Sequence, residues 1–181
     1  MKKLVVLGLV ACSSVFANTV YIGAGANIDS ITRNYVRTYD DALVSSVDGD
    51  GKGIYFKIGV ETKSKDRLEF VYGKDTLTNS NNSSDSNDVT SFEFNGIISI
   101  IKLSNHLFLP YFKGGFGIYQ NKEWDKTGFG AMIGLGTYIN ITQNIEADLS
   151  YKFKFTRTDI NDDYYMMDYY NGLSLGVNYK F

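Results

Sequence analysis

Few residues of this chain carry side chains suited to acid–base or nucleophilic chemistry. His106 is the single histidine and Cys12 the single cysteine. A histidine can act as a general base only when it lies within hydrogen-bond reach of a substrate. His106 falls in a short connection, residues 102–106, between two predicted strands, and we interpret it as a turn residue. We therefore predict no catalytic site.

The carboxylates offer little more for metal binding. Asp48-Gly49-Asp50-Gly51 resembles part of a calcium loop, but Ser46 and Lys57 stand where further ligands are needed. A second acidic cluster comprises Asp159, Asn161, Asp162, Asp163 and Asp168. We interpret the first as a turn in a long loop and the second as a solvated loop, and we expect no metal and no cofactor.

A larger set of charged residues has a more informative spacing, because its members alternate with apolar residues. The set is Lys57, Glu61, Arg67, Glu69, Glu93, Lys113, Glu146, Asp148, Lys152, Lys154 and Lys180. Six are basic and five are acidic. Because a buried, unpaired charge is costly, this near-balance predicts an ion-pair network. The expected pairing joins Lys57, Arg67, Lys113, Lys152 and Lys154 to the five carboxylates.

Eight segments of alternating hydrophobicity must position these charges. They lie near residues 19–29, 53–61, 67–75, 89–101, 107–120, 128–139, 145–156 and 169–181. Segments of about ten residues with this alternation are typical of membrane β-barrels. No later segment is apolar for 18 residues, which argues against membrane-spanning helices. We predict an all-β fold, an eight-stranded antiparallel up-and-down transmembrane β-barrel.

The last strand sets the orientation of all the others. Leu173, Leu175, Val177, Tyr179 and Phe181 share one face, and Lys180 lies on the other. We expect this strand to pair with 19–29 and close the barrel, because an exposed, hydrophobic edge strand promotes aggregation. A Lys or Arg facing lipid at the midplane costs roughly 2–4 kcal/mol. Residues in register with Phe181 should therefore face lipid, and those in register with Lys180 the lumen.

Small residues indicate how the lumen is filled. The chain has 18 glycines in 181 residues, above the average of about 7%, and most fall on the polar face of the predicted strands. Eight-stranded interiors are just wide enough for side chains to fill, so we expect a packed lumen. Aromatic residues are assigned to the membrane interfaces: Phe108, Tyr111, Tyr179 and Phe181 at one end, and Tyr119, Trp124, Tyr164, Tyr165, Tyr169 and Tyr170 at the other.

The connections alternate in length. Segments 30–52, 76–88, 121–127 and 157–168 are long, whereas 62–66, 102–106 and 140–144 are tight. Long extracellular loops and short periplasmic turns are typical of outer-membrane barrels. Asn79–Asp88 is a polar low-complexity run, which we interpret as a mobile loop. Binding would be carried by loops 30–52, 76–88 and 157–168.

The first residues predict export. Lys2 and Lys3 precede a short apolar run, Leu4–Ala11, and Val15-Phe16-Ala17 predicts cleavage between Ala17 and Asn18. The expected domains are thus a signal peptide, 1–17, and a barrel, 18–181. Leu9-Val10-Ala11-Cys12 also matches a lipobox, which would make Cys12 a lipidated N-terminus. The very short apolar run favours ordinary cleavage.

Residues 18–181 resemble the small eight-stranded outer-membrane barrels of the OmpA-like and OmpX-like group. The resemblance rests on the architecture and the closing strand, and it does not extend to the periplasmic peptidoglycan-binding domain of full-length OmpA. It implies a bacterial outer-membrane location with both termini periplasmic and contacts with lipid and lipopolysaccharide. It also implies that Val177, Tyr179 and Phe181 signal to the barrel-assembly machinery, with periplasmic chaperones assisting. In such a barrel His106 would lie at the periplasmic end, away from surface substrates.

Several functions fit this reading. We expect a monomeric, non-enzymatic structural or surface-interaction barrel whose loops bind a host or cell-surface ligand. The alternatives are a narrow porin-like channel, an outer-leaflet lipid-modifying enzyme and a soluble lipocalin-like binding barrel. The formal net charge of −2 argues against nucleic-acid binding, which requires an excess of basic residues.

Overall fold

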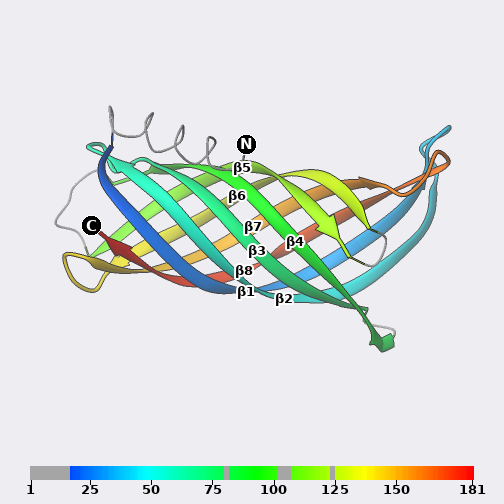
Figure 1. Ribbon diagram of the computed structural model, residues 1–181, viewed down its shortest axis with the longest axis horizontal. Coiled ribbons are helices and arrows are strands. Elements are labelled where there is room, and N and C mark those ends of the chain that lie inside the picture. Colours follow the sequence, from blue (N-terminus) through cyan, green and yellow to red (C-terminus); the bar gives the residue numbers. More distant parts are fainter. Residues whose placement is uncertain (1–16, 80–81, 102–106, 123–124) are drawn as a thin grey trace.

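Eight antiparallel strands form a closed barrel in the computed structural model (Figure 1). The structure describes residues 17–79, 82–101, 107–122 and 125–181. The strands are β1 (Ala17–Arg37), β2 (Leu43–Thr62), β3 (Arg67–Asn79), β4 (Asn82–Ser99), β5 (Phe108–Asn121), β6 (Lys126–Asn140), β7 (Ile145–Asp159) and β8 (Tyr164–Lys180). Among the described residues, no helix is long and apolar enough to cross a membrane. The predicted barrel is confirmed.

The seam between β1 and β8 closes the sheet. Their register runs from Tyr21 opposite Lys180 to Arg37 opposite Tyr164. The backbone N–H of Phe181 also donates to the carbonyl of Val20, at 3.0 Å. The predicted pairing of the first and last strands is therefore confirmed, and no edge strand is left open.

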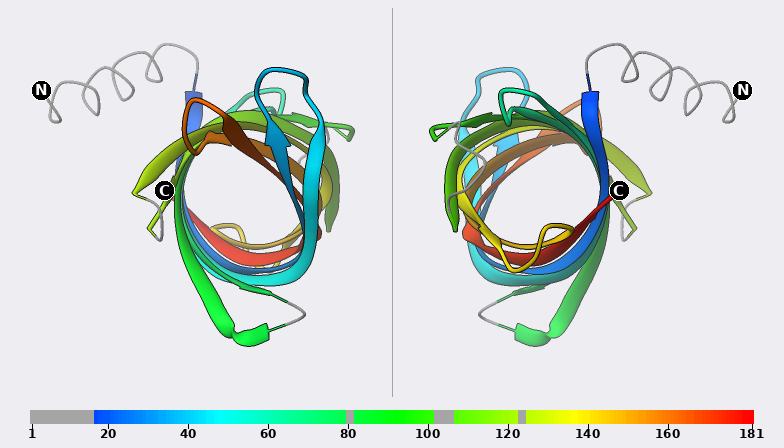
Figure 2. Two further views of the ribbon diagram at one scale, coloured as in Figure 1. Left: turned by 90° about the vertical axis from the view of Figure 1, so that its right-hand side faces the viewer. Right: turned by 90° about the vertical axis from the view of Figure 1, so that its left-hand side faces the viewer.

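The two ends of the barrel differ. One end, which we call the turn end, holds the start of β1, the C-terminus, the turns 63–66 and 141–144, the end of β4 and the start of β5 (Figure 1, left). The other, the hairpin end, holds the turns 38–42 and 160–163, the ends of β3 and β5 and the starts of β4 and β6. At the hairpin end, the tip of the β3–β4 pair reaches outward beyond the ring of strands (Figure 2, left panel).

The strands are longer than predicted at the hairpin end. Most of segment 30–52 belongs to β1 and β2, and most of 76–88 belongs to β3 and β4. Asp48–Gly51 is therefore extended strand, not a turn, and Asn82–Asp88 is strand rather than mobile loop. The apolar alternation stops where the strands leave the lipid-facing region, but the backbone hydrogen bonds continue. Hydrophobic periodicity thus marked the apolar region and not the strand ends.

The outward face is apolar over a continuous band, and the inward face is polar. The apolar band includes Ile22, Ile28, Ile54, Phe56, Leu68, Tyr72, Phe92, Ile98, Phe112, Ile118, Phe129, Ile133, Leu149, Phe153, Leu173 and Val177, all exposed. A lipocalin-like barrel has an apolar interior, whereas this interior is charged, so that alternative is wrong. Above the band, towards the hairpin end, the outward positions form a polar rim: Ser30, Lys52, Lys74, Thr90, Gln120, Thr127, Arg157 and Asn171.

Four of the aromatic residues assigned to the interfaces do not face lipid. Tyr111, Tyr119, Tyr165 and Tyr170 are all buried. Successive side chains of a strand point to opposite faces, so the parity of a residue, its odd or even position along the strand, decides its direction. By this parity Tyr111 and Tyr119 point into the lumen with Lys113 of the same strand, and Tyr170 points into the lumen with Lys180. Tyr179 and Phe181 do lie on the outward face, with their rings packed edge to face at 5.1 Å. Trp124 lies outside the described residues.

Candidate functional site

The lumen gathers the eleven charged residues singled out in the sequence. Nine of them are buried, and Lys113 and Lys180 are half-buried. The structure adds four inward-facing charges that sequence reasoning missed: Asp29, Arg33, Asp75 and Asp168. Asp168 leaves the acidic cluster with which it was grouped, because its parity on β8 directs it inward. Parity alone would have identified Asp29 and Asp75.

A cluster around Arg67 fills the lumen at the turn end. The Arg67 guanidinium pairs with Glu61 of β2 at 2.5 Å. It also forms a bidentate salt bridge with Glu146 of β7, in which one hydrogen bond is 2.9 Å long. Lys180 of β8 reaches both carboxylates, at 3.3 Å to Glu61 and 2.6 Å to Glu146. The guanidinium also stacks on the ring of Tyr138, 3.7 Å from its centroid. Lys65 also pairs with Glu61, at 2.7 Å, so three cations surround two carboxylates.

A second cluster surrounds Lys57 near the middle of the barrel. Its ammonium contacts Glu69 of β3 at 2.9 Å and Asp148 of β7 at 2.6 Å. Tyr21 donates its hydroxyl to Glu69 at 2.8 Å, and Tyr111 donates to Asp148 at 2.6 Å. Charge-assisted hydrogen bonds of this kind are among the strongest in proteins. They hold the walls of β2, β3 and β7 together across the lumen.

Towards the hairpin end, two lysines of β7 reach carboxylates on other strands. Lys152 pairs with Asp29 of β1 at 3.3 Å, and Lys154 lies 3.6 Å from Asp75 and 3.9 Å from Glu93. Asp29 and Asp75 were absent from the predicted pairing. Which residues meet depends on how strands face each other across the barrel, and one sequence does not specify that geometry.

Two further layers close the hairpin end of the lumen. Arg33 of β1 forms a bidentate salt bridge with Asp168 of β8, with hydrogen bonds of 2.8 and 3.1 Å. Beneath it, Ile31, Leu77, Val89, Tyr119 and Tyr170 form an apolar cluster inside the barrel. A charged layer thus lies over an apolar one inside this end of the barrel.

Lumen tyrosines pack on glycines of neighbouring strands. Tyr111 lies opposite Gly136, and a Cβ on that glycine would be 2.4 Å from the tyrosine ring. Tyr55 lies in the same way against Gly25, and Tyr21 against Gly59. Each glycine therefore makes room for a ring that fills the interior. The glycine-rich inward face was predicted, but its partner tyrosines were not.

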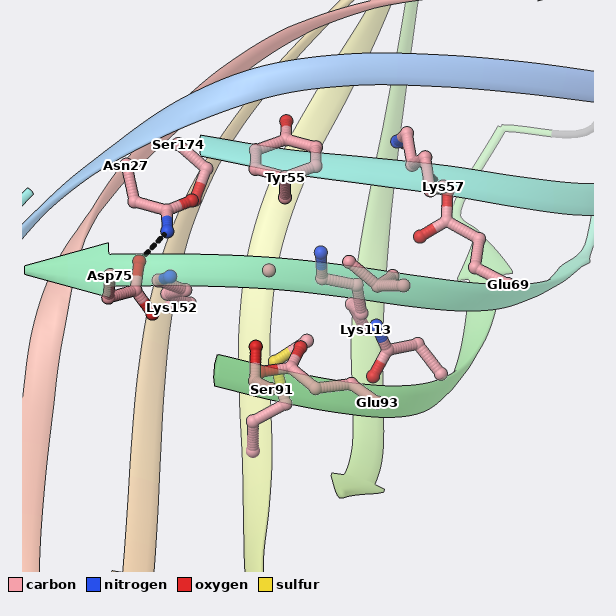
Figure 3. A pocket seen from close by; sticks show the side chains of 14 residues that line it. Asn27, Tyr55, Lys57, Glu69, Asp75, Ser91, Glu93, Lys113, Lys152 and Ser174 are labelled. Atoms are coloured by element: carbon pink, nitrogen blue, oxygen red, sulfur yellow. Dashed lines mark hydrogen bonds and ion pairs between the residues drawn. The ribbon is translucent and has the colours of Figure 1, made fainter. Parts of the chain in front are cut away.

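A small pocket lies between the lumen clusters (Figure 3). A pocket of about 30 Å³ is lined by residues that include Asn27, Lys57, Glu93 and Lys113, and Asn27 donates to Asp75 across it at 2.7 Å. A water molecule needs about 10–15 Å³ of such volume, so two or three would fill it. Lys113 lines this pocket, and no ion pair within the described residues joins it to a carboxylate.

The remaining predicted sites lie at the two chain termini. Val177, Tyr179 and Phe181 face outward at the turn end, and their role in assembly stays a prediction. β1 begins at Ala17, so the expected cleavage between Ala17 and Asn18 would fall at its first residue. Cys12 and the rest of the expected signal peptide lie outside the described residues, as does His106. Among the described residues, no group of His, Cys, Asp and Glu side chains could hold a metal ion.

An apolar exterior around a closed, charged interior defines the class of transmembrane β-barrels. More particularly, the chain belongs to the family of the outer membrane protein beta-barrel domain, whose sequence profile matches residues 4–181. That family places the protein in the bacterial outer membrane. No curated protein matches the chain in sequence.

Two solved structures are similar to this chain. Neisserial surface protein A is 16% identical over 90% of this chain and 97% of its own, with a TM-score of 0.52. At that identity the likeness shows the fold alone. The outer membrane protein OprG from Pseudomonas aeruginosa is 10% identical over 92% of this chain and 97% of its own, with a TM-score of 0.43.

Proposed function

We propose that this protein is a non-conducting, non-enzymatic outer-membrane barrel that presents its hairpin end at the cell surface. The observation that carries the proposal is the filled lumen. From one end to the other, the Arg67 cluster, the Lys57 cluster, the apolar layer and the Arg33–Asp168 pair succeed one another. The pocket beside the Lys57 cluster has room for only a few waters. A solid barrel is best suited to hold surface hairpins rigidly.

The hairpins supply the surface for interaction. The β1–β2 pair continues beyond the apolar band from Ser30 to Arg37, which is about 25 Å at 3.3 Å per residue. Around its tip, Tyr39, Leu43 and Val44 are exposed at 73%, 61% and 52%. Apolar side chains held on a projecting hairpin are suited to bind a host or cell-surface molecule.

Planar-bilayer recording of the folded protein tests the closed lumen. We expect no stable, discrete conductance for the native protein. The variant Arg33→Ala with Tyr119→Ala and Tyr170→Ala removes the layers at the hairpin end and should raise the conductance. A stable channel in the native protein that this variant leaves unchanged would contradict the proposal.

Cysteine labelling in whole cells tests the orientation. A membrane-impermeant maleimide should label Thr38→Cys at the β1–β2 tip and should not label Lys63→Cys in the 63–66 turn. The reverse pattern would place the hairpin end in the periplasm. Lipid A mass spectra from cells with and without the gene test the non-enzymatic role, and a mass change that depends on the protein would overturn it.

The interaction role needs its own measurement. Adhesion of cells that display the native barrel should fall when Tyr39, Leu43 and Val44 are all replaced by Ser. The matched control is Ile28→Ser in the apolar band, compared at equal surface expression. Equal adhesion of the native and tip variants would remove the proposed binding surface.

A further inference from the structure

Basic residues are unevenly distributed around the polar rim. Lys52 of β2 and Lys74 of β3 lie on neighbouring strands, and Lys122, which directly follows β5, meets Lys74 at Asp88 of the intervening strand β4. On β1, β6 and β8 the rim residues are neutral, and Arg157 of β7 pairs with Asp159 at 3.2 Å. We call Lys52, Lys74 and Lys122 the lysine patch.

The lysine patch is organised around Asp88 of β4. The ammonium groups of Lys74 and Lys122 both contact the same Asp88 oxygen, at 3.1 and 3.6 Å. Thr76 donates to the other oxygen at 3.0 Å, and Lys52 is the ladder partner of Thr76. Two ammonium groups thus share one carboxylate, which leaves an excess of one positive charge around Asp88, and Lys52 adds a further cation on the adjacent strand.

Asp88 and the backbone fix the position of the two paired lysines. The backbone N–H of Lys122 donates to the carbonyl of Asp88 at 3.0 Å. Lys74 and Lys122 remain 46% and 58% exposed, so both can reach a ligand from outside. Because they share one oxygen as partner, they lie close enough for a single phosphate group to bridge them.

Aromatic side chains lie directly below the lysine patch in the apolar band. The rings of Tyr72 and Phe92 are 5.2 Å apart, and Phe70 lies 6.3 Å from Phe92. Tyr72 and Phe92 are each 40% exposed. The face therefore presents cations at headgroup depth and apolar rings at acyl-chain depth. An amphipathic anion matches both layers, whereas a soluble anion matches only the first.

We propose that the lysine patch binds the phosphate groups of an anionic lipid, whose acyl chains pack on Tyr72 and Phe92. A lysine ammonium is a compact charge suited to phosphate, and a phosphate offers several strong acceptor oxygens. Because Lys74 and Lys122 together carry one more positive charge than Asp88 neutralises, the phosphate is attracted without displacing that carboxylate. The site faces the leaflet and lies outside the lumen and away from the hairpin tips.

Lipid binding to the folded protein in detergent micelles tests the site. The probes are bisphosphorylated lipid A, its fully dephosphorylated form and inorganic phosphate, and native mass spectrometry counts the bound lipid. Each lysine near an anionic headgroup contributes about fivefold in affinity. Replacing Lys52, Lys74 and Lys122 with Gln should therefore weaken binding of lipid A by about a hundredfold. The matched control replaces Arg37, Lys63 and Arg157 with Gln, removes the same charge elsewhere and should bind normally.

Each result bears directly on the proposal. It is supported when the native protein and the control bind lipid A, prefer it to the dephosphorylated form, and lose it only with the lysine patch. Equal weakening in the control would reduce the effect to net charge, and equal binding of dephosphorylated lipid would exclude a phosphate site. Displacement of the lipid by millimolar inorganic phosphate would make the ligand a free anion. If the triple variant does not show a heat-shift on gels, Lys74→Gln and Lys122→Gln are measured singly.

Discussion

Arg67 and Glu146 lie on β3 and β7, diametrically opposite strands of the barrel, and their side chains form a bidentate salt bridge across the lumen. Both side chains are almost fully buried. The pair ties together two walls that share no backbone hydrogen bond. It complements the ladder, which joins only neighbouring strands.

Removing one partner of this pair should be costly. Within the described part of the chain, Arg67→Ala leaves Lys65 and Lys180 as the cations that pair with Glu61 and Glu146. Breaking a buried ion pair in this way costs about 3–5 kcal/mol. Urea unfolding in lipid vesicles measures the change in the free energy of unfolding. Arg157→Ala, which breaks an exposed pair, should cost less than about 1 kcal/mol, and a similar loss for both variants would refute the role of burial.

The glycine–tyrosine packing can be tested at Gly136. An added methyl group would lie 2.4 Å from the Tyr111 ring and 2.8 Å from the carbonyl of Leu149. The ring cannot yield freely because it stacks on Tyr138 and donates to Asp148. Gly136→Ala should lower the free energy of unfolding by about 1–3 kcal/mol.

An outward-facing glycine supplies the matched control. A methyl group on Gly96 would have its nearest neighbour at 3.9 Å. Gly96→Ala should change the free energy of unfolding by no more than about 0.5 kcal/mol. If both substitutions cost the same, the effect comes from glycine's backbone freedom and not from the tyrosine.

The terminal aromatic allows assembly to be separated from stability. Phe181 faces outward, 70% exposed, and its ring packs against that of Tyr179. Phe181→Ala should therefore change unfolding of the purified barrel little, yet reduce the folded, heat-modifiable fraction in cells. Phe112→Ala, an exposed phenylalanine elsewhere in the apolar band, is the control. Normal assembly of the Phe181 variant would show that this residue carries no assembly signal.

The pH dependence of the lysine patch follows from Asp88. The hydrogen bond from Lys74, with a smaller contribution from Thr76, lowers the pKa of Asp88 below its ordinary value. A lowered pKa means that the pairing is fully formed above the ordinary carboxyl pKa of about 4 and is lost as the pH falls through the folded value. Carbon NMR of the Asp88 carboxyl should show this shift, and Lys74→Met should raise the pKa again. An unchanged pKa in that variant would contradict the contact.

The sequence predicted the fold and the direction of each charge better than the extent of the strands. Period-two alternation placed Lys57, Glu69 and Asp148 correctly in the lumen, because barrel geometry forces successive side chains to opposite faces. It missed Arg33 and Asp168, since both lie beyond the apolar band in segments taken for loops. There the outward residues are polar too, so the alternation disappears while the ladder continues.

The predicted direction of a side chain was wrong where it was inferred from the residue type and not from its alternating position along the strand. Tyr111, Tyr119 and Tyr170 were assigned to interfaces because tyrosine is common there, although their parity matched that of the lumen lysines. The ion-pair partners were harder still. Lys154 meets Asp75 and Glu93 only because β3, β4 and β7 face one another across the closed barrel, and that arrangement depends on strand tilt and register around the whole ring.

The cross-lumen pairs make the barrel an all-or-none object. Arg67 and Glu146 are 79 residues apart, and Lys57 and Asp148 are 91, so no single hairpin contains both members of either pair. Opening the seam between β1 and β8 would let opposite strands move apart. Each buried charge would then lose its counterion. Partial opening is therefore costly in free energy, so the ion pairs that fill the interior also hold the cylinder closed.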